Sequence, residues 1–471
     1  MSQLKTKIKS INLEDILCVF IVLCPVLDML SFIFRNTFDT SISPSTFIRP
    51  IIPISIFIIV FFRKKIKSKM LTASLIYGVY AVIHLLIYNT IKAGCSYGGV
   101  LNEAQYIVNY TFAIMNLFLF TYLFWKKDCE KLTKSMLIAF GIYVASLYIA
   151  ILTGTSSTTY IEGIGYKGWY ESGNSLCAIL CISLCAILPM LKDKKMRPYV
   201  AVITILAGIF LTTLVGTRTG LLGFILVVGL YIASECFVAF MKKVHIDKRI
   251  VGFSILIVVL LIALIIVSGS KTFERREHLE EIQASATDTE TGEIRHLSGD
   301  ITILKNQIEA GELTEEYMPK EMQNAILRLA DYAQRVNLEN NDMRMQQLVY
   351  NFYLVQEQEN VLLTLFGNGY KAQFRELVME MEIPAFLFNF GVCGFVLYFI
   401  PFLAIAVYGV YVAIRKIKNI DTQYIMYLGG SWLAICLSFL SGYTFFNSSS
   451  MIIIIVVEVL LIKKILKLKE Q

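Results

Sequence analysis

Long apolar runs, separated by short polar connectors, dominate the chain from residue 13 to its end. Most of the runs approach or exceed 18 residues, and a helix of that length, rising about 1.5 Å per residue, nearly crosses a bilayer. Backbone groups in lipid must be satisfied within the segment, so the runs are predicted to be helices. The expected spans are 13–34, 46–62, 71–90, 105–125, 136–153, 175–191, 198–214, 221–241, 250–269, 383–413, 424–443 and 450–462.

Every second connector is basic, beginning with the N-terminal segment and ending with the lysine-rich C-terminal tail. Lys and Arg collect in the cytoplasmic connectors of membrane proteins. The alternation therefore predicts an all-α polytopic membrane protein with about twelve transmembrane helices and both termini in the cytoplasm. It also places Arg218 and the polar segment 271–381 together on the outer side of the membrane.

The polar segment divides the chain into three parts: transmembrane helices in 1–270, an extracytoplasmic loop of 271–381, and transmembrane helices in 382–471. The loop holds 20 acidic and 11 basic residues, which leaves a charge of +16 on the remainder of the chain. Residues 283–293 have the composition of a flexible linker. The rest of the loop is expected to form a small helical cap on the outer face of the membrane.

Two helices are predicted within this loop. The first covers 319–338, where helical spacing relates the apolar residues Met322, Ile326, Leu329 and Ala333. The second begins at Asn341 or Asp342 as its N-cap. Its first turn contains Arg344, and its apolar face is expected to consist of Met345, Leu348, Phe352 and Val355.

Composition excludes an ordinary soluble protein, since 56% of the residues are hydrophobic and the mean hydropathy is +0.63. The net charge of +7 is largely explained by the basic connectors, and no nucleic-acid partner is expected. The first apolar run is too long for a cleavable signal peptide.

Cys177, Cys181 and Cys185 recur every four residues on one helix face. They are expected to be small packing residues, with a soft-metal site as the alternative.

The sequence lacks the motifs of several common classes of enzyme. The four histidines, His84, His245, His278 and His296, are scattered along the chain. No phosphate-binding loop, nucleophile elbow or zinc-protease motif occurs, and the cytoplasmic connectors are too short for an ATP-binding domain. We therefore expect no metal and no cofactor.

The remaining candidates all fall on the predicted outer side. Arg218 lies in Gly216-Thr217-Arg218-Thr219-Gly220, between two apolar runs, and an arginine so close to hydrocarbon is usually retained for a reason. Arg344 is the second cation, and Arg49 is a possible third. Gly367-Asn368-Gly369-Tyr370 is a turn signal, and Glu380 and Glu382 precede the run 383–413. Two arginines and a carboxylate at a membrane surface suit an anionic, lipid-linked substrate.

Each candidate also has a structural explanation. Arg218 and Arg49 can snorkel from helix ends, and Arg344 can pair with Glu339 or Asp342. The residues 367–370 can be only a turn, and the two glutamates can be a hydrated helix start. Asp28, within the first span, is expected to be a hydrogen-bonded structural residue.

The order of these motifs resembles the superfamily of O-antigen ligases and Wzy-type polymerases, which assemble bacterial cell-surface polysaccharides. Gly216-Thr217-Arg218-Thr219-Gly220-Leu221 resembles the arginine motif of the family's short outer loop. Arg344 matches the arginine at the start of the helix that precedes a Gly-x-Gly turn, and 367–370 matches that turn. Gly391-Val392-Cys393-Gly394 resembles the family's Gly-x-x-Gly in the next span.

The resemblance implies a GT-C-like enzyme that performs metal-independent, inverting glycosyl transfer on the outer leaflet of the bacterial cytoplasmic membrane. Donor and acceptor are glycans on undecaprenyl diphosphate, and a chain-length regulator and a flippase are the implied protein partners. The ligases typically carry a His-Asn pair where this chain has Glu380-Met381-Glu382. This difference favours a polymerase of capsule, exopolysaccharide or O-antigen repeats. Glu380 is then the first candidate for the base, Arg218 and Arg344 neutralise the diphosphate, and Arg49, Thr217, Thr219, Gly367, Asn368, Gly369, Tyr370 and Glu382 line the substrate site.

Three other functions remain open at this stage. The chain can be a ligase that transfers the glycan to another acceptor. It can be a flippase for the same lipid-linked oligosaccharide, although transporters concentrate polar residues at the membrane midplane. It can also be a non-catalytic scaffold or receptor, in which Arg218 and Arg344 would tolerate alanine.

Overall fold

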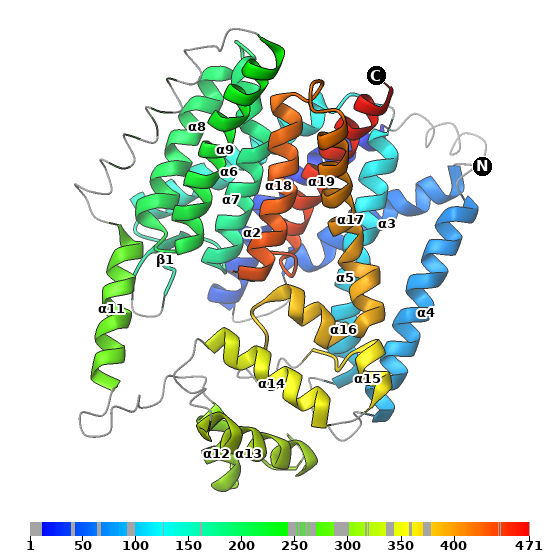
Figure 1. Ribbon diagram of the computed structural model, residues 1–471, viewed down its shortest axis with the longest axis vertical. Helices are drawn as coiled ribbons and strands as arrows, with labels where there is room; N and C mark the ends of the chain where they lie inside the picture. Colours follow the sequence, from blue (N-terminus) through cyan, green and yellow to red (C-terminus); the bar gives the residue numbers. More distant parts are fainter. Residues whose placement is uncertain are drawn as a thin grey trace.

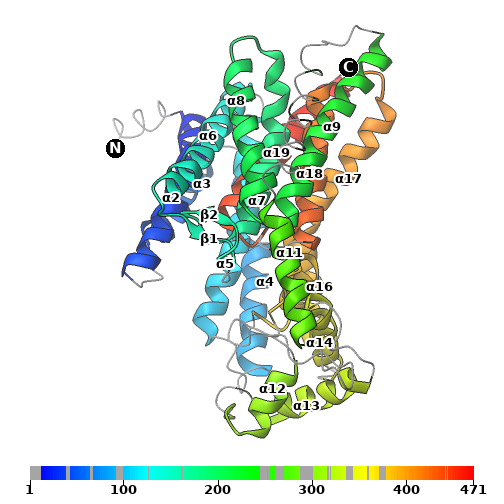
Figure 2. The ribbon, with the colours of Figure 1, turned by 90° about the vertical axis from the view of Figure 1, so that its left-hand side faces the viewer.

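The protein is a bundle of long helices with a group of shorter helices at one end (Figure 1). The computed structural model describes residues 12–470 except 39–42, 64–66, 92–98, 126, 161–162, 287–300, 316–317, 319, 336–342, 358–359, 371–377, 441 and 443, and describes only residues 252, 255, 257, 259 and 262 of 244–269. Figure 2 shows α12 (Ile301–Glu309), α13 (Lys320–Arg335) and α14 (Met343–Glu357) gathered at one end of the bundle, while the C-terminus lies at the other.

The remaining elements follow the predicted order of apolar runs. They are α2 (Leu13–Phe38), α3 (Pro44–Arg63), α4 (Lys67–Ile91), α5 (Gly99–Phe124), α6 (Glu130–Leu152), β1 (Ser157–Thr158), β2 (Tyr166–Gly168), α7 (Gly173–Ile187), η1 (Leu188–Lys192), α8 (Arg197–Ile209), η2 (Phe210–Leu214), α9 (Arg218–Lys242), α11 (Lys271–Ala286), α15 (Val361–Phe366), α16 (Glu382–Tyr398), α17 (Ile400–Arg415), α18 (Thr422–Leu440) and α19 (Ser448–Glu470). The strands β1 and β2 form a small antiparallel hairpin.

Nine of the described helices are long and apolar enough to cross a membrane, or ten if α16 and α17 form one span bent by 47°. The expected span 250–269 falls almost entirely outside the described residues. The last expected span lies in α19, which is not among the nine because charged residues interrupt its apolar run. The structure therefore confirms a polytopic helical membrane protein, and the count of twelve stays a prediction.

Helix α7 forms the centre of the bundle. It is buried along its length and packs against α9, α18 and α19. The expected packing role of its cysteines is confirmed, because a Cβ on Gly220 would lie 3.0 Å from Cys177 Sγ and one on Gly223 would lie 2.8 Å from Cys181 Sγ. Small residues on both helices let their backbones approach closely.

Most of the described residues between α9 and α16 are helical, with one correction to the prediction. The helix α11 continues to Ala286, so the first residues of the expected linker 283–293 are helical, while 287–293 lie outside the described residues. The prediction for α13 is confirmed. Met322, Ile326, Leu329 and Ala333 are all buried, in a small core shared with α12 and α14.

Two of the predicted apolar residues of α14 face away from the protein. Met345 and Phe352, expected in its apolar face, are 48% and 61% exposed, whereas Gln347 and Asn351 are buried. The predicted N-cap residues of this helix lie outside the described residues. A helix at a membrane surface can bury polar residues against the protein and leave apolar ones facing outward, which reverses the rule for soluble helices.

Candidate functional site

A tight turn joins η2 to α9 and fixes the position of Arg218. The π-helical turn Phe210–Leu214 precedes Gly216, whose φ of +79° is a conformation that favours glycine. The carbonyl of Val215 accepts a hydrogen bond of 2.7 Å from Thr159 Oγ1. A Cβ on Gly165 would lie 2.3 Å from that same oxygen. The hairpin that contains β1 and β2 therefore packs directly on the arginine turn.

Thr217 is the N-cap of α9, since its hydroxyl accepts from the amide of Gly220 at 3.1 Å. The same hydroxyl lies 3.1 Å from Cys177 Sγ, and the residue is buried. Arg218 is exposed as the first residue of the helix, and Thr219 is half-buried beside it. Thr217 thus shapes the turn, while Arg218 remains accessible.

The start of α11 lies against this turn and contributes an arginine that sequence reasoning did not single out. Ser270 Oγ donates to the carbonyl of Thr212 at 2.7 Å, and Thr272 Oγ1 donates to the carbonyl of Thr217 at 3.4 Å. These contacts place the Arg275 guanidinium 4.6 Å from the centre of the Tyr160 ring. The sequence did not distinguish Arg275 as a site residue, because it is one of many charged residues in this stretch.

The phenol of Tyr160 is under the electrostatic influence of three arginines. Burial raises the pKa of its phenol, while the charges of Arg275, Arg344 and Arg218 lower it. Of the three, Arg275 contacts the ring directly, while Arg344 and Arg218 act on the phenol through their charges. The arginines come from α11, α14 and α9, so tertiary structure alone unites them. We call Arg218, Arg275 and Arg344 the arginine cluster.

Arg344 and the predicted base Glu380 are in direct contact. Arg344 Nε donates to Glu380 Oε2 at 3.0 Å, with side-chain exposures of 32% and 34%. Arg344 Nη1 also donates to the carbonyl of Leu440. The amide of Glu380 donates to Gln347 Oε1 at 3.1 Å, which fixes the backbone of Glu380 against α14. The alternative partners proposed for Arg344, residues 339 and 342, lie outside the described residues.

Glu382 occupies a different environment from Glu380. It is fully buried, and its carboxylate accepts from the amides of Phe445 at 2.8 Å and Phe446 at 2.7 Å. It therefore holds the connection between α18 and α19 and is not part of a hydrated helix start. Helix α16 begins at Glu382, so Glu380 precedes the helix.

The turn 367–370 packs on the bend of α16. The amides of Asn368 and Gly369 donate to the carbonyls of Phe388 at 2.8 Å and Asn389 at 2.9 Å. Asn368 is fully buried. The turn 367–370 and the glycine motif 391–394 are therefore parts of one structural unit, joined by backbone hydrogen bonds.

A buried pair anchors the same turn to α4 and α5. His84 Nε2 lies 2.8 Å from Glu103 Oε1, and His84 Nδ1 contacts the carbonyl of Phe366. Glu103 Oε2 accepts from the amide of Tyr370 at 2.8 Å, and the Tyr370 ring stacks on Tyr106 with centroids 4.3 Å apart. Sequence reasoning did not assign this pair a role, although ionisable residues within apolar runs are a recognised signal.

Arg49 belongs to another part of the same end of the bundle. It pairs with Asp28 and donates to Ser448 and to Ser449 Oγ at 2.8 Å. Asp28 also accepts from the Tyr143 hydroxyl at 2.7 Å, which agrees with its expected structural role. Arg49 lines a cavity that does not include the described atoms of the arginine cluster.

Within the part of the chain that the structure describes, no group of three or more His, Cys, Asp and Glu side chains is arranged to hold a metal. A search of curated proteins finds no match to the chain. A family model for O-antigen ligase-like membrane proteins matches residues 11–468, nearly the whole chain. The chain therefore belongs to this family of membrane-bound, glycosyltransferase-like proteins of lipid-linked glycan assembly.

Proposed function

We propose that the protein polymerises oligosaccharide repeats carried on undecaprenyl diphosphate, by inverting, metal-independent glycosyl transfer at the outer face of the bacterial cytoplasmic membrane. The observation that carries the proposal is the arginine cluster around Tyr160 with the carboxylate of Glu380 on one of its arginines. The cluster supplies cations for a departing diphosphate, and Glu380 supplies a proton acceptor.

The arginine cluster suits a diphosphate leaving group. Guanidinium groups bind phosphate oxygens through two parallel hydrogen bonds. Arg218 is the first residue of α9, and a helix N-terminus adds partial positive charge and free amides. Charge develops on the diphosphate as its bond to the sugar breaks, and prearranged cations at that position lower the barrier.

Glu380 acts as the base in this proposal. Its carboxylate takes the proton from an acceptor hydroxyl, whose oxygen attacks the anomeric carbon of the donor sugar. The bond from that carbon to the diphosphate breaks on the opposite face, and the diphosphate leaves with the electron pair. The sugar configuration is inverted in this one displacement.

The contact between Arg344 and Glu380 couples the two roles. A donor diphosphate competes with Glu380 for the Arg344 guanidinium, since both are anionic oxygen acceptors. Donor binding thereby weakens the hold of Arg344 on the carboxylate and leaves Glu380 available to the acceptor hydroxyl.

A polymerase is favoured over a ligase because carboxylates stand where the family's ligases typically carry a His-Asn pair. The test is a reaction in proteoliposomes with purified protein and lipid-linked repeat units. Polymerisation gives longer glycans on the lipid diphosphate. Transfer to an added second acceptor alone would identify a ligase, and movement of the donor between leaflets without a new glycosidic bond would identify a flippase.

A further inference from the structure

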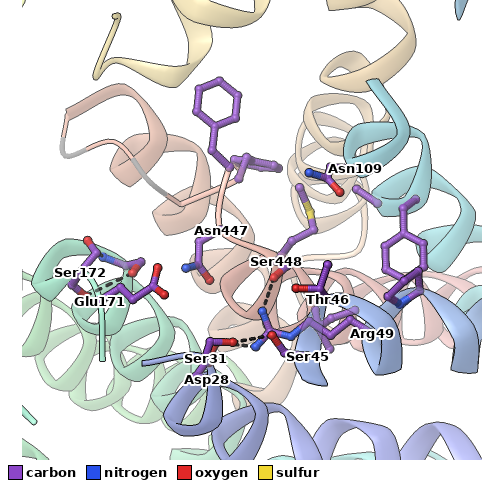
Figure 3. A pocket seen from close by; sticks show the side chains of 18 of the residues that line it. Asp28, Ser31, Ser45, Thr46, Arg49, Asn109, Glu171, Ser172, Asn447 and Ser448 are labelled. Atoms are coloured by element: carbon purple, nitrogen blue, oxygen red, sulfur yellow. Dashed lines mark hydrogen bonds and ion pairs between the residues drawn. The ribbon is translucent and has the colours of Figure 1, made fainter. Parts of the chain in front are cut away.

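A cavity of about 630 Å³ contains Arg49 in its lining and none of the three residues of the arginine cluster. Its walls come from α2, α3, α5, the start of α7 and the connection before α19. Its volume lies within the range of about 300–1,000 Å³ that is typical of small-molecule sites. Figure 3 shows Arg49 between Asp28 and Ser448, with Asn109 and Asn447 projecting from other walls.

The described lining of this cavity has no net formal charge. Its four charged residues form two ion pairs, Arg49 with Asp28 and Arg35 with Glu171 at 3.0 Å. Most other polar lining residues carry hydroxyls or carboxamides, among them Ser31, Ser45, Thr46, Gln105, Asn109 and Asn447. A diphosphate needs unneutralised cations, which this lining does not supply.

Polar groups in the lining are left without protein partners. Asn116 is fully buried; its Nδ2 donates to the carbonyl of Phe112 at 2.9 Å, but its Oδ1 has no partner. Arg49 Nε is also buried without a partner. One of these atoms is an acceptor and the other a donor, so a group that both donates and accepts can satisfy them. Tyr110, Tyr170, Phe445 and Phe446 add aromatic surface to the lining.

Two segments join the cavity to the arginine cluster. The connection before α7 carries Tyr160 at the cluster and Tyr170 in the cavity lining. The last residue of α18, Leu440, contacts Arg344 through its carbonyl, and the connection that follows contributes Phe445 to the cavity. The two sites are therefore connected by short stretches of chain, ten residues from Tyr160 to Tyr170 and five from Leu440 to Phe445.

From these observations we propose that the cavity binds uncharged sugar residues of the glycan, while the arginine cluster binds the diphosphate. This inference rests on the proposed function. Hydroxyl groups both donate and accept, as the unpaired lining atoms require, and sugar rings place apolar faces on aromatic side chains. The charged residues of the lining sum to zero, whereas the three arginines of the cluster with Glu380 sum to +2, so the diphosphate is expected at the cluster.

The test measures the binding of two probes to the full-length protein in nanodiscs. The first is the neutral oligosaccharide released by mild acid from the cells' lipid-linked donor, and the second is farnesyl diphosphate. Asn116→Leu removes the unpaired carboxamide, and Asn109→Trp fills the cavity from an exposed position on α5. Both variants are expected to weaken oligosaccharide binding about tenfold or more and to leave farnesyl diphosphate binding unchanged. Arg344→Ala is expected to weaken the binding of farnesyl diphosphate and to leave oligosaccharide binding unchanged.

Unchanged oligosaccharide binding in the cavity variants would overturn the inference, as would competition by farnesyl diphosphate for the oligosaccharide site. If Asn116→Leu does not fold, Asn109→Trp decides alone. The proposed function is tested by a different result. It would be contradicted if the wild-type protein bound the oligosaccharide in the cavity but formed no glycosidic bond from the lipid-linked donor.

Discussion

A Cβ added to Gly391 would lie 2.5 Å from the amide nitrogen of Gly367, so these two glycines, 24 positions apart, meet backbone to backbone. Gly391 has φ of +68° and ψ of −177° within α16, a conformation almost confined to glycine. The bend of α16 and the turn 367–370 therefore depend on each other. The close approach of Gly367 and Gly391 gives both glycine motifs a structural role, whether or not either one contacts substrate.

Gly391→Ala is expected to destabilise the protein by about 1–3 kcal/mol from backbone strain alone, and the clash with Gly367 adds to this. Activity should fall with stability, because the turn would separate from α16. Thermal unfolding in detergent measures the effect. Gly229→Ala on α9 is the control, since an added Cβ there meets nothing within 4 Å. Equal melting temperatures for the two variants would contradict the close approach.

Glu103→Leu is expected to release the turn 367–370 from α5. The change removes the acceptor of both His84 Nε2 and the Tyr370 amide. Removing one partner of a buried polar pair typically costs about 3–5 kcal/mol. Leu101→Ala on the same helix is the control, because Leu101 is 86% exposed. Melting temperature and polymer yield are the measurements, and a Glu103 variant as stable as the control would show that the pair is dispensable.

The sequence predicted the membrane helices well because apolar runs in lipid have few structural alternatives. It also predicted the buried face of α13, whose residues Met322 and Leu329 pack into a core. For α14, helical spacing predicted the helix but not what its apolar residues face. An apolar stripe containing Met345 and Phe352 can face either a protein core or a membrane surface, and helical spacing is identical in both cases.

The candidate site was only partly predictable. Arg218 and Arg344 stood out by their motifs, but Arg275 joins them only through the hydrogen bonds of Ser270 and Thr272. Such contacts link residues more than 50 positions apart, and one sequence contains no record of them. The direct contact between Arg344 and Glu380 was likewise unforeseen, because both residues had been assigned to the site without a geometry.

Arg218→Lys and Arg344→Lys are each expected to lower the polymerisation rate about a hundredfold while the protein still inserts. Lysine keeps the charge but lacks the forked contact to a diphosphate. Initial rates with the lipid-linked donor measure the effect, with Arg415→Lys in the last turn of α17 as the control. Near-normal rates in both cluster variants would indicate that these arginines only snorkel or pair at the surface.

Sidedness is open to a separate test. The alternation of basic connectors predicts that a tag at residue 296 is accessible from outside intact cells and that a tag at residue 242 is not. Impermeant labelling before and after permeabilisation measures this. A tag at residue 296 that reacts only after permeabilisation would place the arginine cluster in the wrong compartment for the proposed reaction.

The central claim is that Glu380 accepts the proton from the acceptor hydroxyl. Glu380→Gln keeps the shape and an oxygen that can accept from Arg344, but it removes the basic carboxylate. Glu382→Gln is the matched comparison: it is expected to weaken the backbone contacts to Phe445 and Phe446, and so to lower stability with a milder loss of polymer.

The decisive measurement is polymer length in a purified system with the lipid-diphosphate donor, alongside donor binding by each variant. The account predicts that Glu380→Gln binds the donor and makes no polymer. Loss of donor binding in that variant would make Glu380 a binding residue, and full-length polymer would contradict its role as the base.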